Sequence, residues 1–264
     1  MKLNFAKLNP TQNMTIIVTD SVPAHIRCEV AEKLMAYGSI GAEQVGFLEA
    51  PRLPGVRARL EMMGGEFCGN ASMSLAALLA HEDGLADGAA AEIPLEVSGA
   101  EDVINCRIVR RGDSFLGTVK MPLPKRIGAV GTHPAVFFDG IVHAILPENA
   151  MTPAEAEAFA REQCALLGAD AMGVLLVNAD MSAFRPLVYV RETNSCVWEH
   201  GCGSGSAAIG AYAAAQRGSD VSLDLAQPGG VIRVHAACSA GCIQKIEITG
   251  TVRIAATGTA WVEL

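Results

Sequence analysis

Short segments in which apolar and polar residues alternate, or in which β-branched residues gather, recur along the chain and predict β-strands. Four longer segments instead place apolar residues at the spacing of an α-helix. The third helix has a clear start, because Thr152 takes its N-cap position and Pro153 follows. Strands and helices mixed in this way predict an α+β, or mixed α/β, fold. The predicted strands are residues 14–18, 45–48, 57–62, 103–109, 114–121, 174–177, 187–190, 231–234, 243–249 and 251–255, and the predicted helices are residues 23–35, 69–80, 153–167 and 203–217.

Two of these helices belong to a repeated sequence pattern. FCGNASMSLAALLA at residues 67–80 and GCGSGSAAIGAYAA at residues 201–214 both begin with Cys, Gly and a polar residue and continue as an alanine-rich, uncharged helix. A helix without charge on any side is expected to be buried all round. One copy in each half predicts two pseudo-symmetric lobes with both motifs at the cleft between them.

The boundary between the predicted lobes falls at the turn-rich segment MPLPK, residues 121–125. We therefore expect an N-terminal lobe of residues 1–121 and a C-terminal lobe of residues 122–251. A C-terminal strand at residues 252–264 is expected to return to the N-terminal lobe.

Composition narrows the possible partners. The chain of 264 residues is 50% hydrophobic, enough for a large core, and its formal charge is −8 with scattered Lys and Arg. A partner nucleic acid or anionic membrane is therefore not expected, and a small molecule is. No run resembles a signal peptide or a membrane span, so we expect a cytoplasmic protein with eight free thiols. The sequence contains no CxxC, GxGxxG, GxxxxGK[ST] or HExxH motif, so we predict no metal site and no cofactor.

The Cys-Gly pairs suggest proton-transfer chemistry. Unpaired N–H groups and the helix dipole favour a thiolate at Cys68 or Cys202, and the same groups can bind a substrate carboxylate. Two such cysteines facing each other would let one remove the α-proton of an amino acid while the other delivers a proton to the opposite face. A single Cys-Gly before a helix is more often structural, since cysteine is a common buried residue. The repetition favours the catalytic interpretation.

At these residues the chain resembles the diaminopimelate epimerase family, whose catalytic cysteines lie in CGN and CGSG or CGTG motifs. QPGG at residues 227–230, ATGTA at 256–260 and VWE at 197–199 extend the likeness over nearly the whole chain. The resemblance implies two mixed lobes, each a sheet rolled around a central helix, with the active site between them. It implies no cofactor and leaves a homodimer possible, because relatives form dimers.

The resemblance also implies residue roles. Cys68 and Cys202 become the acid/base pair, Glu199 would hold the α-ammonium group, and His143 would support catalysis or be a satisfied core histidine. The remaining residues matched to substrate binding are Asn13, Glu43, Gln44, Gly69, Asn70, His200, Gly203 and Ser204, of which Gly69, Asn70, Gly203 and Ser204 would bind the α-carboxylate.

The chain departs from that family where the distal end of diaminopimelate binds. His200 stands in place of an arginine, and Ile141 and Ala171 stand in place of two asparagines. A distal carboxylate would be buried without partners, which disfavours diaminopimelate. The segments EQVGF and EFCGN are similar to those of histidine racemases, where Glu43 could accept a hydrogen bond from an imidazole or pair with a nearby base. L-Histidine is therefore the predicted substrate, with diaminopimelate or another amino acid as the alternative.

Three rival functions remain at this stage. The phenazine-biosynthesis isomerases share the implied fold but lack paired cysteines, and the proline racemases have different motifs around theirs. An amino-acid-binding protein without turnover is the non-enzymatic alternative. Five of the remaining cysteines have no glycine at a helix start and are interpreted as core or surface thiols: Cys28, Cys106, Cys164, Cys238 and Cys242. Cys196 is close to Cys202 in sequence, which leaves an oxidation-prone pair as an alternative, although the family offers no role for it.

Overall fold

Helix α2 (Gly69–Glu82) is the centre of the N-terminal unit. The computed structural model describes residues 1–264, which divide into one unit of Met1–Lys120 with Thr249–Leu264 and a second of Met121–Ile248. Every residue of α2 from Gly69 to Ala80 is buried. Because the helix carries Ala, Leu, Met and Ser on all sides and no charge over this stretch, it can be enclosed without burying an unpaired ion.

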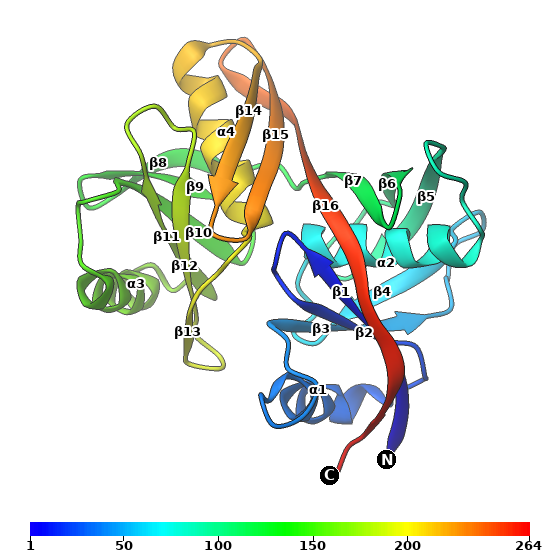
Figure 1. Cartoon of the computed structure of the whole chain (residues 1–264). Helices are drawn as coiled ribbons and strands as arrows, with labels where there is room; N and C mark the ends of the chain where they lie inside the picture. The colour runs from blue at the N-terminus through cyan, green and yellow to red at the C-terminus, as the bar shows by residue number, and fades with distance from the viewer. The chain divides into compact units, whose positions relative to one another are not determined.

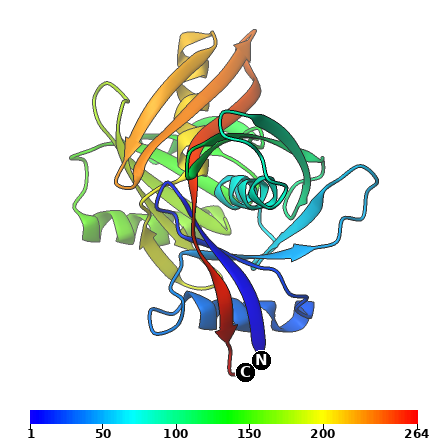
Figure 2. The same cartoon turned by 45° about the vertical axis from the view of Figure 1, so that its right-hand side comes forward.

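Strands close around α2 as a ring. The order β1-β2-β3-β4-β5-β6-β7-β16 is closed by pairing of β1 with β16, and α2 contacts β1, β2, β5, β6 and β7. Figure 2 looks nearly along the axis of α2 and shows the strands encircling it. Closure leaves no unpaired sheet edge in this ring. The strands are β1 (Lys2–Pro10), β2 (Thr15–Val18), β3 (Gln44–Glu49), β4 (Ala58–Met62), β5 (Ala90–Val97), β6 (Ile104–Arg111), β7 (Ser114–Lys120) and β16 (Cys242–Trp261), the last running through both units.

A second helix covers the outside of the ring. A 3₁₀ turn, η1 (Ala24–Ile26), leads into α1 (Arg27–Met35), which lies beside β3 in Figure 1. Its apolar side, formed by Val30, Ala31 and Leu34, packs into a cluster with residues of β1, β2, β3 and the end of β16.

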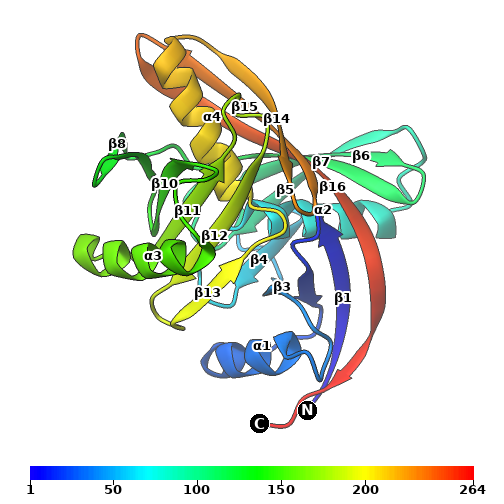
Figure 3. The ribbon, with the colours of Figure 1, turned by 60° about the vertical axis from the view of Figure 1, so that its left-hand side comes forward.

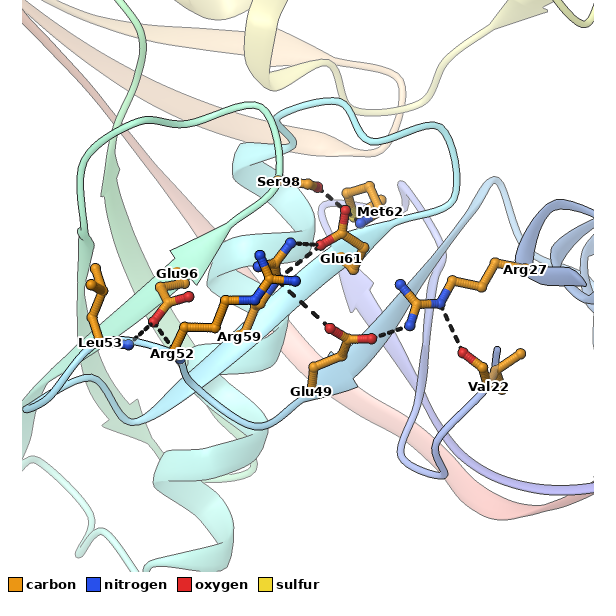
Figure 4. A network of polar contacts seen from close by, with 10 residues as sticks. All are labelled: Val22, Arg27, Glu49, Arg52, Leu53, Arg59, Glu61, Met62, Glu96 and Ser98. Carbon is orange, nitrogen blue, oxygen red and sulfur yellow. Dashed lines mark hydrogen bonds and ion pairs between the residues drawn. The ribbon is translucent and has the colours of Figure 1, made fainter. Parts of the chain in front are cut away.

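Alternating charges link α1 to the neighbouring strands. Arg27 pairs with Glu49, and Arg59 pairs with Glu61 and lies 3.7 Å from the second oxygen of Glu49. Figure 4 shows these four side chains joined one to the next, with Glu49 between the two arginines. Each half-buried charge therefore has an opposite charge beside it, which offsets part of its desolvation.

The same face holds the loop that leads to Cys68. The Ser98 hydroxyl accepts from the Met62 amide at 2.9 Å and donates to the Glu66 carbonyl at 2.8 Å. Next to it, Gly99 has φ +69°, and a Cβ there would lie 2.3 Å from the Phe67 nitrogen. A glycine is needed at this position both for its backbone conformation and for the close approach.

The C-terminal unit repeats the arrangement around α4 (Gly203–Arg217). This helix contacts β9, β10, β14 and β15, and its Ala- and Gly-rich surface is buried almost all round. Figure 3 shows α4 lying along β14 and β15. The strands of this unit are β8 (Arg126–Val130), β9 (His133–Phe137), β10 (Ile141–Pro147), β11 (Ala171–Val177), β12 (Phe184–Val190), β13 (Ser195–Trp198), β14 (Val221–Gln227) and β15 (Gly230–Ser239).

Helix α3 (Pro153–Leu167) packs on the outer side of the sheet β13-β12-β11-β10-β9-β8. Its buried residues Ala156, Ala160 and Cys164 join a cluster with side chains of β9, β10, β11 and β12. The helix begins with a complete capping box between Thr152 and Glu155. None of the helices combines the length and the apolar composition that crossing a bilayer requires.

The element predictions have a mixed outcome. The helices at 153–167 and 203–217 are confirmed to the residue, and the helix at 69–80 extends to Glu82. The helix predicted at 23–35 instead starts at Arg27 after the 3₁₀ turn. The prediction of two strands at 243–249 and 251–255 is wrong, because β16 continues unbroken through Gly250, where extended backbone suits glycine as well as any residue. The strands β1, β5, β8, β9, β10, β13 and β14 were not predicted.

We predict that Thr152→Ala lowers the free energy of unfolding by about 1 kcal/mol, because the variant loses the hydroxyl that accepts from the Glu155 amide. Urea denaturation measures the change. The exposed Glu162 on the same helix provides the control, and Glu162→Ala should have little effect. Equal losses in the two variants would show that the cap contributes nothing specific.

Candidate functional site

Cys68 is the N-cap residue of α2. Its backbone is extended, with φ −131° and ψ 111°, and its sulfur accepts from the Ala71 amide at 3.4 Å. The Ser72 hydroxyl donates to the Cys68 carbonyl at 2.7 Å. The sulfur therefore occupies the place where an N-cap oxygen normally satisfies a first-turn amide. Cys68 is half-buried, so its thiol can meet a ligand.

A chain of amide side chains leads away from the Cys68 thiol. The thiol donates to Gln44 Oε1 at 3.0 Å, and Gln44 Nε2 donates to Asn13 Oδ1 at 2.5 Å and Thr15 Oγ1 at 2.8 Å. Asn13 Nδ2 donates to Glu43 Oε2 at 2.6 Å. The predicted residues Asn13, Glu43, Gln44 and Cys68 are thus brought together in one network.

Asn70 joins the same network from the first turn of α2. Its Nδ2 donates to Asn13 Oδ1 at 3.1 Å, and both side chains are buried. Asn13 itself follows a tight turn in which Thr11 and Gln12 have φ of 52° and 60°. The turn directs the Asn13 side chain, which is only 4% exposed, toward the start of α2.

Cys202 has the same relation to α4. It is the N-cap residue, with φ −108° and ψ 107°, and its sulfur accepts from the Gly205 amide at 3.3 Å. The Ser206 hydroxyl donates to the Cys202 carbonyl at 2.8 Å, just as Ser72 does to Cys68. The repeat predicted from the two Cys-Gly motifs therefore extends to a serine four residues after each cysteine. That serine was not singled out from the sequence, although the Cys-x-x-x-Ser spacing occurs in both copies.

Gln227 is a second residue that sequence analysis did not assign to the site. Its Oε1 accepts from the Cys202 amide at 2.6 Å, and its Nε2 donates to Ser206 Oγ at 3.1 Å. The QPGG motif was interpreted only as part of a family likeness. In the structure its first residue holds the backbone at which α4 begins.

His143 lies beneath the first turn of α4. Its Nε2 is 2.9 Å from Ser204 Oγ, which in turn lies 3.5 Å from the Cys202 sulfur. The ring is completely buried, its Nδ1 has no hydrogen-bond partner, and burial lowers the pKa of His143 from 6.5 to about 3. Gly173 makes room for it, since a Cβ at that residue would lie 2.0 Å from Nδ1. His143 is thus both a neutral core histidine and a neighbour of the predicted site.

The surroundings of Cys202 disfavour its thiolate in the free protein. Burial is the largest cause that raises the pKa of Cys202 well above its ordinary value, and the negative charge of Glu199 and its hydrogen bond with the thiol add to this. The contacts with Ser204 and the Gly205 amide act in the opposite direction but are weaker. The Gly205 amide at the helix start therefore favours a thiolate at Cys202, as expected, but desolvation outweighs this contribution in the free protein.

The other predicted residues lie as follows within their units. Gly69 and Gly203 are buried at the first positions of α2 and α4, where backbone amides have no acceptor within the helix. Glu199 is half-buried and follows β13, whereas His200 is exposed. The His200 carbonyl accepts from the Gly229 amide at 2.8 Å, which ties the segment before Cys202 to the turn after Gln227.

Comparison with known proteins identifies close relatives. A family model described as the histidine racemase CntK N-terminal domain matches residues 2–261. The histidine racemase of Staphylococcus aureus is 34% identical over an alignment of 278 positions, which covers 99% of this chain and 98% of that protein. The histidine racemase of Fusobacterium nucleatum is 30% identical over an alignment of 273 positions, which covers 98% of this chain and 97% of that protein.

The fold also occurs in solved structures of lower sequence identity. A structure described as a predicted epimerase from Pseudomonas aeruginosa superposes with a TM-score of 0.68 at 18% identity. The superposition covers 99% of this chain and 100% of that one. This likeness, together with the two units described above, confirms the predicted mixed α/β fold of the diaminopimelate epimerase type.

The lowered pKa of His143 has a defined effect on stability. As pH falls below 6.5, the unfolded chain binds a proton at His143 while the folded chain does not until about pH 3, so acid favours unfolding. Between about pH 7.5 and about pH 5, we expect the wild type to lose about 2 kcal/mol more unfolding free energy than His143→Gln. Urea denaturation at both pH values measures this difference. The exposed His25 provides the control, and His25→Gln should keep the pH dependence of the wild type. An equal pH dependence in wild type and His143→Gln would contradict the prediction.

Proposed function

This chain belongs to the histidine racemase family, and we propose that it interconverts L- and D-histidine without a cofactor, with Cys68 and Cys202 as the two bases. One cysteine, as thiolate, takes the α-proton from one face of the substrate, and the other, as thiol, gives a proton to the opposite face. The observation that carries the proposal is that each unit holds a cysteine sulfur at the N-cap of its buried central helix.

The first turns of α2 and α4 suit the α-carboxylate of the substrate. The amides at Gly69, Gly203 and Ser204 lie at helix starts, where the partial positive charge of the helix favours an anion. An α-carbanion draws its stability from charge spread onto that carboxylate, so donors fixed around it lower the barrier. In water the same donors would be far less effective, because the solvent would screen them.

Glu199 suits the α-ammonium group. In the free protein its charge and hydrogen bond keep the proton on Cys202. A substrate ammonium that pairs with Glu199 would cancel this repulsion and take over the hydrogen bond, so substrate binding itself would lower the pKa of Cys202. The base would then form only when a substrate is bound, its proton having been released to solvent.

Glu43 is the residue we assign to the histidine side chain. One of its oxygens accepts from Asn13, and a carboxylate has further acceptor sites for an imidazole N–H. The names of the relatives support histidine. Diaminopimelate remains the less suitable alternative, because His200, Ile141 and Ala171 do not offer the groups that would bind a second carboxylate and ammonium.

We expect that L- or D-histidine incubated with the protein loses all optical rotation, and that diaminopimelate and L-proline do not.

Cys68→Ser and Cys202→Ser should each lower kcat in both directions by roughly 10²- to 10⁴-fold, because a serine hydroxyl is a much weaker acid than a thiol and is not deprotonated near neutral pH. The exposed Cys28 provides the control, and Cys28→Ser should retain activity.

Polarimetry distinguishes the alternatives in this experiment. Binding of histidine without loss of rotation would identify an amino-acid-binding protein. Turnover of diaminopimelate in preference to histidine would replace the substrate, and near-full turnover by either serine variant would remove that cysteine from the mechanism.

Glu199→Gln should change the pH profile in a specific way. Because Glu199 raises the pKa of Cys202 in the free enzyme, the acidic limb of kcat/KM should move to lower pH in the variant. The maximal kcat/KM should fall roughly 10- to 100-fold, since the ammonium loses a charged partner. Glu192→Gln removes an exposed charge of the same unit and should shift neither quantity. An unmoved acidic limb in Glu199→Gln would contradict the assigned role.

A further inference from the structure

The hydrogen bonds around Gln44 have a fixed direction. Both N–H groups of Gln44 Nε2 are used, one on Asn13 Oδ1 and one on Thr15 Oγ1. Only the carbonyl oxygen, Oε1, is then left to face the Cys68 sulfur at 3.0 Å. A carbonyl oxygen accepts and cannot donate, so the contact exists only when the sulfur carries its proton.

Two groups that can only accept determine this direction. Glu43 is a carboxylate, so the group that Asn13 turns toward it must be Nδ2, which leaves Asn13 Oδ1 to face Gln44. The Thr15 hydroxyl donates to the backbone carbonyl of Asn13 at 3.0 Å, so its oxygen is left to accept from Gln44. Thr15 is completely buried, so bulk solvent does not reach this contact. A reversed Gln44 amide would break both arrangements.

We propose that Gln44, locked by Glu43 through Asn13 and by Thr15, is a positioning residue that keeps the proton on Cys68, so that Cys68 is the acid of the resting enzyme. The inference rests on the proposed two-cysteine reaction and adds the direction in which the resting enzyme carries it out. Glu43, until now assigned only to substrate binding, gains a second role at the far end of the network.

The two cysteines differ in what their partners can do. The thiol of Cys202 interacts with the Glu199 carboxylate, whose hold on the proton is cancelled when a substrate ammonium arrives. The thiol of Cys68 interacts with an amide oxygen that belongs to the protein and is not displaced in this way. For the enantiomer whose α-hydrogen faces Cys202, the first turnover therefore begins with Cys202 taking the α-proton, and Cys68 S–H supplies a proton to the opposite face. The enzyme then holds a Cys202 thiol and a Cys68 thiolate, and one proton from solvent restores Cys68.

The test measures the proton on Cys68 without any substrate. The rate of iodoacetamide alkylation is followed against pH, with the cysteine-containing peptides resolved by mass spectrometry and exposed Cys242 as an internal reference. The double variant Thr15→Val/Glu43→Gln frees the Gln44 amide to turn its N–H groups toward a thiolate. We expect the pKa of Cys68 to fall by about one, which is about a tenfold faster alkylation at neutral pH.

A second background separates this effect from the charge of Glu43. In Gln44→Met the amide is absent, so adding Thr15→Val and Glu43→Gln should shift the alkylation profile of Cys68 no further. Thr15→Val alone removes no charge, yet it should produce part of the shift when Gln44 is present. Should the double variant fail to fold, the two single variants in both backgrounds decide the same question.

Ser74→Ala provides the matched control, because Ser74 is buried on α2 and its hydroxyl has no hydrogen-bond partner. It should leave the alkylation profile unchanged. The proposal is overturned if Thr15→Val/Glu43→Gln leaves Cys68 unchanged, or if the whole shift persists in Gln44→Met. Neither result depends on turnover, so an enzyme that fails to racemise histidine still gives a decision on the Cys68 proton.

Discussion

The contact between a cysteine sulfur and the backbone amide three residues later, at the start of a buried helix, is the interaction on which the rest of this structure depends. A sulfur in that position lies next to first-turn amides that the helix itself cannot satisfy. Both helices are made of small and apolar residues, so each can be enclosed by strands, and the glycine that follows each cysteine is buried. The ring around α2 and the strands around α4 then serve the same purpose in the two units.

The two units repeat this contact but surround it with different chemistry. Cys68 is tied to a network of neutral amides that ends at Glu43, whereas Cys202 is tied to Glu199, Ser204 and the neutral ring of His143. A racemase needs one acid and one base at any moment, and two identical environments would give no preference. Burial and the charge of Glu199 raise the pKa of Cys202, and in the mechanism we propose the ammonium group of the substrate offsets the charge of Glu199.

The sequence predicts the helices well and the strands less well. The helix at Pro153–Leu167 carries its boundaries in Thr152, Pro153 and Gly168, which form local contacts that need no tertiary context. The alternation in β1 is broken where Phe5 and Ala6 are both buried, and both β1 and β14 contain lysine, asparagine or aspartate, which have low β-propensity. The edge strand β13 spans only four residues and shows too little pattern to be detected.

The residues of the candidate site also differ in whether a local sequence signal identifies them. The cysteines, Gln44, Asn13 and Ser204 can be named from sequence because they lie in short motifs. Thr15 and Gln227 could not be assigned, since their roles arise only when β2 and β14 are placed beside the helix starts. The repeated serines at 72 and 206 are the exception, because their spacing from each cysteine was present in the sequence.

The most direct test of the two-cysteine mechanism follows the α-hydrogen when a single enantiomer of histidine is incubated with the enzyme in D₂O. At early times the two enantiomers are separated and the deuterium content of each is measured by mass spectrometry. Two cysteines acting on opposite faces predict deuterium in the newly formed enantiomer and almost none in the recovered starting enantiomer. Equal deuterium in both enantiomers from the first time point would show that one group removes and returns the proton, and would contradict the two-cysteine mechanism.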